Sequence, residues 1–190
     1  MRQPLASIFH AGTVTVFERS ELHSFSTFGG PLEHEVVGAE LSRPLHQIIH
    51  LNHNNLKAIA PPCYVFDLPL VHGMAYSGCA LTYRFEFDRI TIESLSPAQP
   101  TNGWPYRDYP ALFPFYPITE VEVTRQTWSE FSERAPNLPE DQPAELVALV
   151  PPPVGLGFTL WGAHGDAEGV TLVFECDLNA KRVSAYSVFS

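Results

Sequence analysis

The clearest alternation of apolar and polar positions in the chain lies in its middle, between Tyr64 and Leu95. In the second half of this stretch, apolar and polar side chains follow each other in strict turn: Leu81, Tyr83, Phe85 and Phe87 against Thr82, Arg84, Glu86 and Asp88. A period of two places successive side chains on opposite faces, so residues 81–87 are predicted to form a strand with one buried face. Residues 89–93 predict a second strand, because the alternation shifts at Asp88.

Shorter patterns of the same kind predict further strands along the chain. They are rich in β-branched and aromatic residues and are bounded by turn-forming residues. They cover residues 13–18, 120–125, 145–150, 157–161, 170–177 and 182–189. The last two predict a hairpin around Asn179-Ala180, in which Leu172, Phe174 and Cys176 share one face.

The segment from Pro44 to Cys63 fits two competing patterns. As a helix it would place His46, His50 and His53 on one face. As a strand it would place His46 and His50 on the face of Ile48, with His53 pointing the other way. The bracketing prolines and the Asn54-Asn55 turn signal favour the strand.

Proline divides the rest of the chain. Pro69 interrupts an apolar run and predicts an edge strand or an irregular segment. Residues 97–117 contain proline and aromatic residues at close intervals, which predicts a rigid loop lying over the sheet. A capping box, Thr127 with Glu130, predicts one helix of about eight residues starting at Trp128. The fold class is therefore α+β, predominantly antiparallel β-sheet with one short helix and long proline- and aromatic-rich loops, in a single domain covering residues 1–190.

Composition and charge limit the possible partners. The chain has 21 Asp and Glu against 11 Lys and Arg, a formal net charge of −10, and only 17% charged residues. A negative field repels phosphate backbones and anionic lipids, so we expect neither a nucleic-acid nor a membrane partner. It would attract a basic protein, although an acidic surface also serves solubility alone. Seven of the acids and two of the bases lie between Glu120 and Glu145, which is half of the net charge.

The cysteines and the N-terminus indicate a cytoplasmic protein. The three cysteines, Cys63, Cys79 and Cys176, form no C-x-x-C pair, and their odd number fits a reducing compartment. The N-terminal residues show no sustained apolar region of a secretory signal, and no run of about 18 apolar residues predicts a membrane span.

Candidate catalytic and metal-binding groups are incomplete. A helical His46–His50 pair could bind a metal, but the glutamate of an H-E-x-x-H motif is absent. Cys63, His72 and Cys79 have the chemistry of zinc ligands without a known spacing. His164 and Asp166, or Asp67 and His72, could orient a general base, but no nucleophile motif accompanies them. The sequence therefore predicts no catalytic residue, metal or cofactor, and buried or hydrogen-bonded side chains explain these residues equally well.

The candidate partner-binding residues come from two segments. The aromatic loop could supply rigid interface anchors at a small entropic cost, and the acidic stretch could attract a basic surface. The candidates are Trp104, Tyr106, Arg107, Asp108, Tyr109, Glu130, Glu133, Glu140 and Asp141. The aromatic loop could equally plug one end of a sheet, or close a pocket for a small ligand.

Three segments between residues 44 and 150 resemble a known class of bacterial protein. They read LHQIIHLNHNNL, WPYRDYPALFPFYPI and ELVALVPP in this order. The chain is similar in these segments to immunity-type proteins of polymorphic-toxin systems. The resemblance implies a cytoplasmic α+β protein that binds and neutralises a cognate, often basic, toxin domain. The alternative hypotheses are a metal-dependent or hydrolytic enzyme that uses His46, His50, His72 or His164, and a small-ligand-binding β domain.

Overall fold

The computed structural model describes residues 4–41, 44–60, 64–76, 79–96, 113–135, 137–153 and 170–189. These residues form two short helices and the strands of a single sheet. The elements follow in the order β1 (Ala6–His10), β2 (Thr13–Arg19), β3 (Thr27–Gly30), β4 (Glu35–Val37), β5 (His46–Leu51), α1 (His53–Ile59), β6 (Leu68–His72), β7 (Ala80–Phe85), β8 (Arg89–Ser96), β9 (Phe113–Arg125), α2 (Trp128–Ser132), β10 (Leu146–Val150), β11 (Val170–Asp177) and β12 (Arg182–Phe189).

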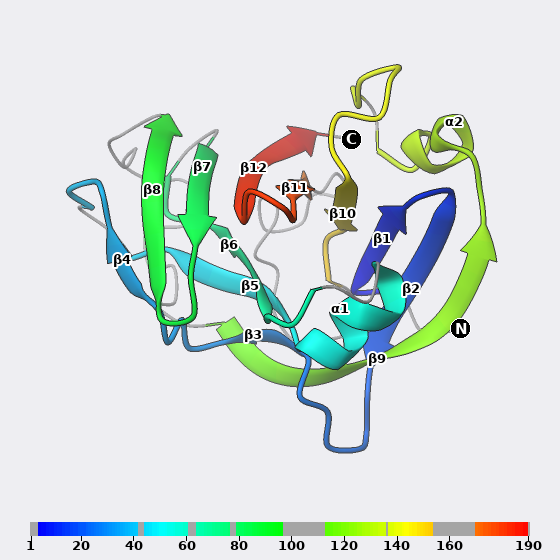
Figure 1. The fold of residues 1–190 in the computed structure, drawn as a ribbon, viewed down its shortest axis with the longest axis horizontal. Coiled ribbons are helices and arrows are strands. Elements are labelled where there is room, and N and C mark those ends of the chain that lie inside the picture. The colour runs from blue at the N-terminus through cyan, green and yellow to red at the C-terminus, as the bar shows by residue number, and fades with distance from the viewer. Residues whose placement is uncertain are drawn as a thin grey trace, which may run out of the picture.

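The 12 strands pair in the order β4-β8-β7-β12-β11-β10-β1-β2-β9-β3-β5-β6. The pairing of β4 with β8 is parallel, and the other described pairings are antiparallel. The sheet curls over itself, so that β6 at one end packs against β12 in its middle (Figure 1). The described residues therefore form a mostly antiparallel β-sheet that curls around a buried apolar core.

Strand β9 joins the two parts of the curled sheet. Its first residues, from Phe113 to Pro117, pair with β3, and its later residues, from Ile118 to Arg125, pair with β2 on the opposite side. Figure 1 shows β9 sweeping from beneath β3 to the side of the molecule that carries α2. Gly29 of β3 allows β9 to pass close to it, because a Cβ at this position would lie 2.2 Å from the Pro114 carbonyl oxygen. The φ of Gly29 is +70°, a conformation that also favours glycine.

The sheet buries apolar side chains on both of its faces near β1, β2 and β10. The inner face contributes to the main core, for example through Ile8, Phe17 and Phe174. The outer face forms a second cluster, in which Phe9, Val147 and Val173 pack beneath α2. The second cluster explains why these strands read as nearly continuous apolar runs in the sequence.

The buried end strand β6 is completed by a tyrosine from another strand. Each residue of β6 is buried, and among the described strands only β5 pairs with it, along one edge. On its other edge the Val71 backbone N–H donates to the Tyr83 hydroxyl at 2.9 Å, and that hydroxyl donates to the Pro69 carbonyl at 2.7 Å. One fully buried phenol from β7 thus supplies the partners that a neighbouring strand would otherwise provide.

Most of the predicted strands are confirmed. β2, β7, β8, β10 and the β11–β12 hairpin lie where the alternation placed them, and residues 120–125 form the second half of β9. β6 is the predicted edge strand with a proline in it. Leu172, Phe174 and Cys176 face the main core together. The predicted strand at 157–161 lies outside the described residues.

Four expectations are wrong in detail. There are two short helices instead of one, because Asn52 caps α1 by accepting from the Asn54 amide where we expected a turn. α2 spans five residues, fewer than expected. Phe87 is 99% exposed in the β7–β8 connection, since β7 ends at Phe85. Residues 113–117 belong to β9, while the rest of the predicted loop, residues 97–112, lies outside the described residues.

Pro117 is tolerated within β9 for a specific reason. The Pro117 carbonyl accepts from the Ser20 amide on the β2 side, so the nitrogen of Pro117 faces that side as well. Its missing N–H therefore removes no bond from the ladder with β3. Composition alone predicted a loop, because it does not show which edge of a strand a proline faces.

Neither described helix approaches the length and apolar character that a membrane crossing requires.

Replacing Tyr83 by Phe should test the closure of β6. The substitution keeps the ring but leaves the Val71 N–H and the Pro69 C=O buried without partners, which should lower the free energy of unfolding by about 2–5 kcal/mol. Tyr186→Phe is the matched control, since its half-buried hydroxyl donates to Glu175 at 2.7 Å, and it should cost at most about 1 kcal/mol. Urea unfolding measures both, and equal small losses would contradict the assigned role of Tyr83.

Candidate partner-binding surface

The acidic segment between β9 and β10 is held in shape by its helix cap. The Thr127 hydroxyl accepts from the Glu130 amide, and the Glu130 carboxylate accepts from the Thr127 amide at 2.7 Å. The bond from the Thr127 amide, and then one from the Thr127 hydroxyl, which donates to the same carboxylate at 2.9 Å, lower the pKa of Glu130. Glu130, a predicted partner-binding residue, is therefore exposed and charged, but its carboxylate also stabilises α2.

Two aromatic residues dock α2 and the segment that follows it. Phe131 is fully buried against Phe9, and the Trp128 ring lies edge-on to Phe9 with centroids 5.5 Å apart. The Trp128 indole N–H donates to the Pro139 carbonyl at 3.0 Å. This bond holds Glu140 and Asp141 beside α2.

The predicted acidic residues are brought together at one side of the molecule. Glu133, Glu140 and Asp141 are exposed, and α2 and the segment leading into β10 are neighbours in Figure 1. The second half of β9 leads directly into α2 and adds the exposed Glu120 and Glu122. Within the described residues, none of these five acids forms an ion pair. We call Glu120, Glu122, Glu133, Glu140 and Asp141 the acidic surface.

Acids elsewhere on the sheet are neutralised by arginine. Glu93 of β8 binds both Arg84 and Arg182, each at 2.6 Å, and Arg89 binds Glu35 at 3.1 Å. The hydrogen bond and charge of Arg182, and then those of Arg84, lower the pKa of the exposed Glu93. The described arginines of β7, β8 and β12 thus pair with Glu93 and Glu35, whereas Arg125 and Arg134, the bases in the segment of the acidic surface, form no ion pair with its acids among the described residues.

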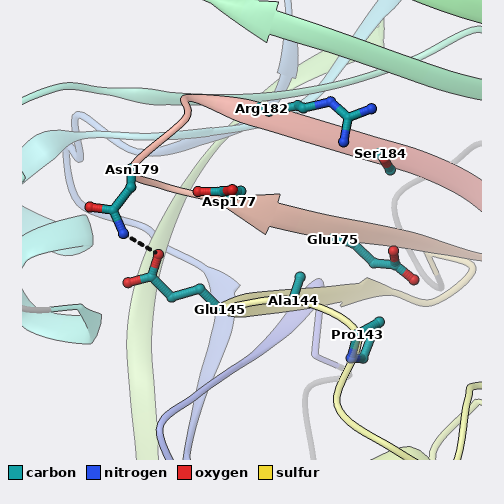
Figure 2. A pocket seen from close by; sticks show the side chains of 8 residues that line it. All are labelled: Pro143, Ala144, Glu145, Glu175, Asp177, Asn179, Arg182 and Ser184. Atoms are coloured by element: carbon teal, nitrogen blue, oxygen red, sulfur yellow. Dashed lines mark hydrogen bonds between the residues drawn. The ribbon is translucent and has the colours of Figure 1, made fainter.

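A polar hollow lies where the acidic segment enters the sheet. It has a volume of about 420 Å³, and it is lined by Pro143, Ala144, Glu145, Glu175, Asp177, Asn179, Arg182 and Ser184. Figure 2 shows these side chains approaching from the start of β10, from β11 and from the β11–β12 turn and β12.

The carboxylates of this hollow already have partners. Glu145 accepts from the Tyr64 hydroxyl at 2.9 Å and from the Asn179 amide at 3.4 Å, the bond drawn in Figure 2. Glu175 accepts from the Tyr186 hydroxyl, and burial followed by this carboxylate raises the pKa of Tyr186. Asp177 accepts from the Ala180 amide. These bonds hold the three carboxylates that line the hollow, which lies next to the segment that carries Glu140 and Asp141.

The three histidines of the β5–α1 segment separate into two environments. His50 and His53 both contact Asp67, at 3.3 Å and 3.1 Å, near the surface. His46 is buried and lies opposite His72 across β5 and β6. The strand prediction placed His46 and His50 on one face, and this is wrong, because a bulge in β5 between Gln47 and Ile49 reverses the alternation.

His72 is buried among apolar side chains. Within the described part of the chain, neither of its ring nitrogens makes a hydrogen bond of good geometry, and its side chain lies edge-on to Phe174. Burial, and then the neighbouring His46, lower the pKa of His72 to about 3, while the Gly73 backbone offsets part of the effect. His72 is therefore a neutral core residue near pH 7, and an imidazole in this state does not serve as a surface-accessible base.

The described thiols are also unreactive. Cys79 and Cys176 are free and buried, and burial raises the pKa of Cys79 to about 11 and that of Cys176 still further. Within the described part of the chain, no group of three or more His, Cys, Asp or Glu side chains is arranged to hold a metal ion. Cys63, His164 and Asp166 lie outside the described residues, as do Trp104, Tyr106, Arg107, Asp108 and Tyr109.

Sequence reasoning included Glu120 and Glu122 in the acidic stretch but not among the individual binding candidates. Residues 120–125 were predicted to form a strand, and the alternation of Glu and Val in residues 120–123 is the signal that accompanies these two acids. The structure exposes both faces of this segment. The contribution of Glu175 and Asp177 to the hollow had no sequence signal, because it depends on the pairing of β10 with β11.

Comparison of the chain with protein-family models, with curated proteins and with solved structures finds no significant match in any of the three.

The buried His72 predicts a measurable pH dependence of stability. Its pKa is about 3 in the folded chain and about 6.5 when unfolded, so the unfolded state takes up a proton that the native state excludes. The stability that the buried, neutral His72 contributes is fully present above pH 6.5. It is lost as the pH falls toward 3, at about 1.4 kcal/mol per pH unit. Between about pH 7 and pH 5, the wild-type chain should lose about 2 kcal/mol more than His72→Leu in urea unfolding. If the free energies of unfolding of the two proteins fall in parallel with pH, His72 accepts a proton in the folded state, and the prediction is wrong.

Proposed function

We propose that this protein is a non-catalytic binding protein that holds a basic protein partner against its acidic surface. The observation that carries the proposal is a set of exposed carboxylates, without ion pairs among the described residues, on three elements that lie at one side of the molecule: β9, α2 and the segment leading into β10 (Figure 1). Opposite charges across an interface accelerate association and select the partner. A chain with a net charge of −10 would favour a basic partner at long range as well.

The way in which the acidic surface is built supports a binding role. Like charges placed close together destabilise a fold, so their concentration at one side calls for a compensating gain. Trp128 and Phe131 anchor these residues to the sheet, and the capping box fixes the start of α2. A preorganised surface binds with a smaller loss of conformational entropy than a flexible one.

The resemblance to immunity-type proteins suggests which basic partner this is. In this proposal the partner is a toxin domain, and binding to the acidic surface blocks the basic groups with which the toxin holds its own anionic substrate. The buried free thiols Cys79 and Cys176 support a reducing, cytoplasmic location for such a complex.

One arrangement favours an enzyme as the second candidate. Asp67 contacts His50 and His53, and an aspartate in this position can orient an imidazole as a general base. Within the described residues, neither histidine hydrogen-bonds a serine, threonine or cysteine side chain that could act as nucleophile. The arrangement therefore supports an enzyme less directly than the acidic surface supports a binding protein.

The test of the proposed function is a complex with the protein encoded by the neighbouring gene. Isothermal titration at low salt should detect it, and the affinity should fall as salt screens the charges. Glu140→Lys/Asp141→Lys should weaken binding roughly tenfold or more. Glu86→Lys/Asp88→Lys introduces the same change of charge on the distant β7–β8 connection and should have a smaller effect.

Two outcomes would contradict the proposed function. One is the absence of a complex at low salt, where electrostatic attraction is strongest. The other is an equal loss of affinity in both double variants, which would show a response to net charge without a defined surface.

A further inference from the structure

The second half of β9 has an edge without a neighbouring strand. Toward β3, the last hydrogen bond is that of the Ile118 amide to the Ser26 carbonyl, at 3.0 Å. From residue 119 to residue 125, β9 pairs with β2 on one side, and no described strand pairs with the other. Val121 and Val123 are 50% and 53% exposed on this segment.

The direction of the backbone groups on this edge follows from the pairing with β2. The Gln126 amide donates to the Gly12 carbonyl on the β2 side, and the register continues without interruption from Arg125 to Val123. Backbone groups alternate along a strand, so the amides of Arg125 and Val123 point to the open side. A bulge at Val121 ends the regular edge, which leaves Glu122 to Arg125 as a short template for a further strand.

The side chains of this edge determine which strand it could accept. Charged side chains and β-bulges commonly protect strand edges, and this edge has both, in Glu120, Glu122, Arg125 and the bulge at Val121. Glu120 and Glu122 are exposed and without ion pairs among the described residues. Glu120 pairs with Phe17 and Glu122 with Val16, so the two carboxylates lie on opposite faces of the sheet. A strand with Lys or Arg at alternate positions would compensate Glu122, whereas an antiparallel second copy centred on Glu122 would place two glutamates opposite each other.

We propose that the open edge of β9 binds an extended basic segment of the partner, which adds to the sheet as a strand beside Glu122–Arg125. The proposal rests on the proposed function and gives its binding mode. The backbone of Val123 and Arg125 supplies hydrogen bonds, while Glu122 selects basic side chains on its own face of the added strand.

The test uses a short synthetic peptide of alternating Lys and Val as the probe. Its control is the same peptide N-methylated at alternate residues, which keeps the charge but cannot form the ladder. Fluorescence anisotropy should show that the unmodified peptide binds wild-type protein roughly tenfold or more tightly than the methylated peptide.

A matched pair of variants tests the same edge from the protein side. Val123→Pro removes the outward N–H without removing a bond to β2, and it should abolish the preference for the unmodified peptide. Val123→Thr keeps the N–H and a β-branched side chain, and it should retain the preference. If Val123→Pro fails to fold by circular dichroism, the comparison of the two peptides on the wild type still decides the question.

Each contrary result has a distinct meaning. Equal binding of both peptides would contradict strand addition at β9 but not the proposed role of the acidic surface. Binding of neither peptide by a chain that still forms the complex with the neighbouring gene's product would overturn the strand edge alone. Failure of the peptides and of that complex would overturn both proposals. A wild-type dimer that Val123→Pro dissociates would show that a second copy occupies the edge, which also overturns the proposal.

Discussion

The fold depends on satisfying the free edge of a strand that lies inside the protein. β6 is buried along its whole length, but the strands that the structure describes flank it on one side only. Backbone groups removed from water need partners, and an unpaired one costs about 1–3 kcal/mol. The Tyr83 hydroxyl accepts from Val71 and donates to Pro69, so it links the end of the curled sheet to β7. The same burial raises the pKa of Tyr83, which keeps the phenol protonated and able to donate.

The edge of β6 and the edge of β9 are satisfied in different ways, and this difference links the fold to the proposed function. At β6 the edge is turned inward and is closed by a side chain. At the second half of β9 it is turned outward and no described strand pairs with it, and in our proposal Glu122 favours a basic strand there. The acids of β9, α2 and the following segment lie on the side of the molecule where this edge is open. Attraction at long range and strand addition at short range would therefore direct a partner to the same place.

Local patterns predicted much of the fold, because alternation and capping act between near neighbours in sequence. The capping box of Thr127 and Glu130 and the buried set of Leu172, Phe174 and Cys176 are examples. The predictions that were wrong concern features that depend on pairing between segments distant in the sequence. The bulge at β5 that separates His46 from His50 follows from its register with β6, and Phe113–Pro117 become a strand because β3 lies beside them. Likewise, the acidic surface could be predicted as a segment, but the open edge of β9 could not, since only the strand order shows it.

The central claim is that β6 is closed and β9 is open, and native-state hydrogen exchange tests it in one measurement. The amide of Val71 should exchange only through near-global unfolding, although it lies on the edge of an end strand, because it donates to Tyr83 inside the core. The amide of Val123 should exchange orders of magnitude faster, by local fluctuation, because its edge faces solvent. Similar rates for the two amides would contradict the account, since they would mean either that β6 opens readily or that the edge of β9 is already occupied.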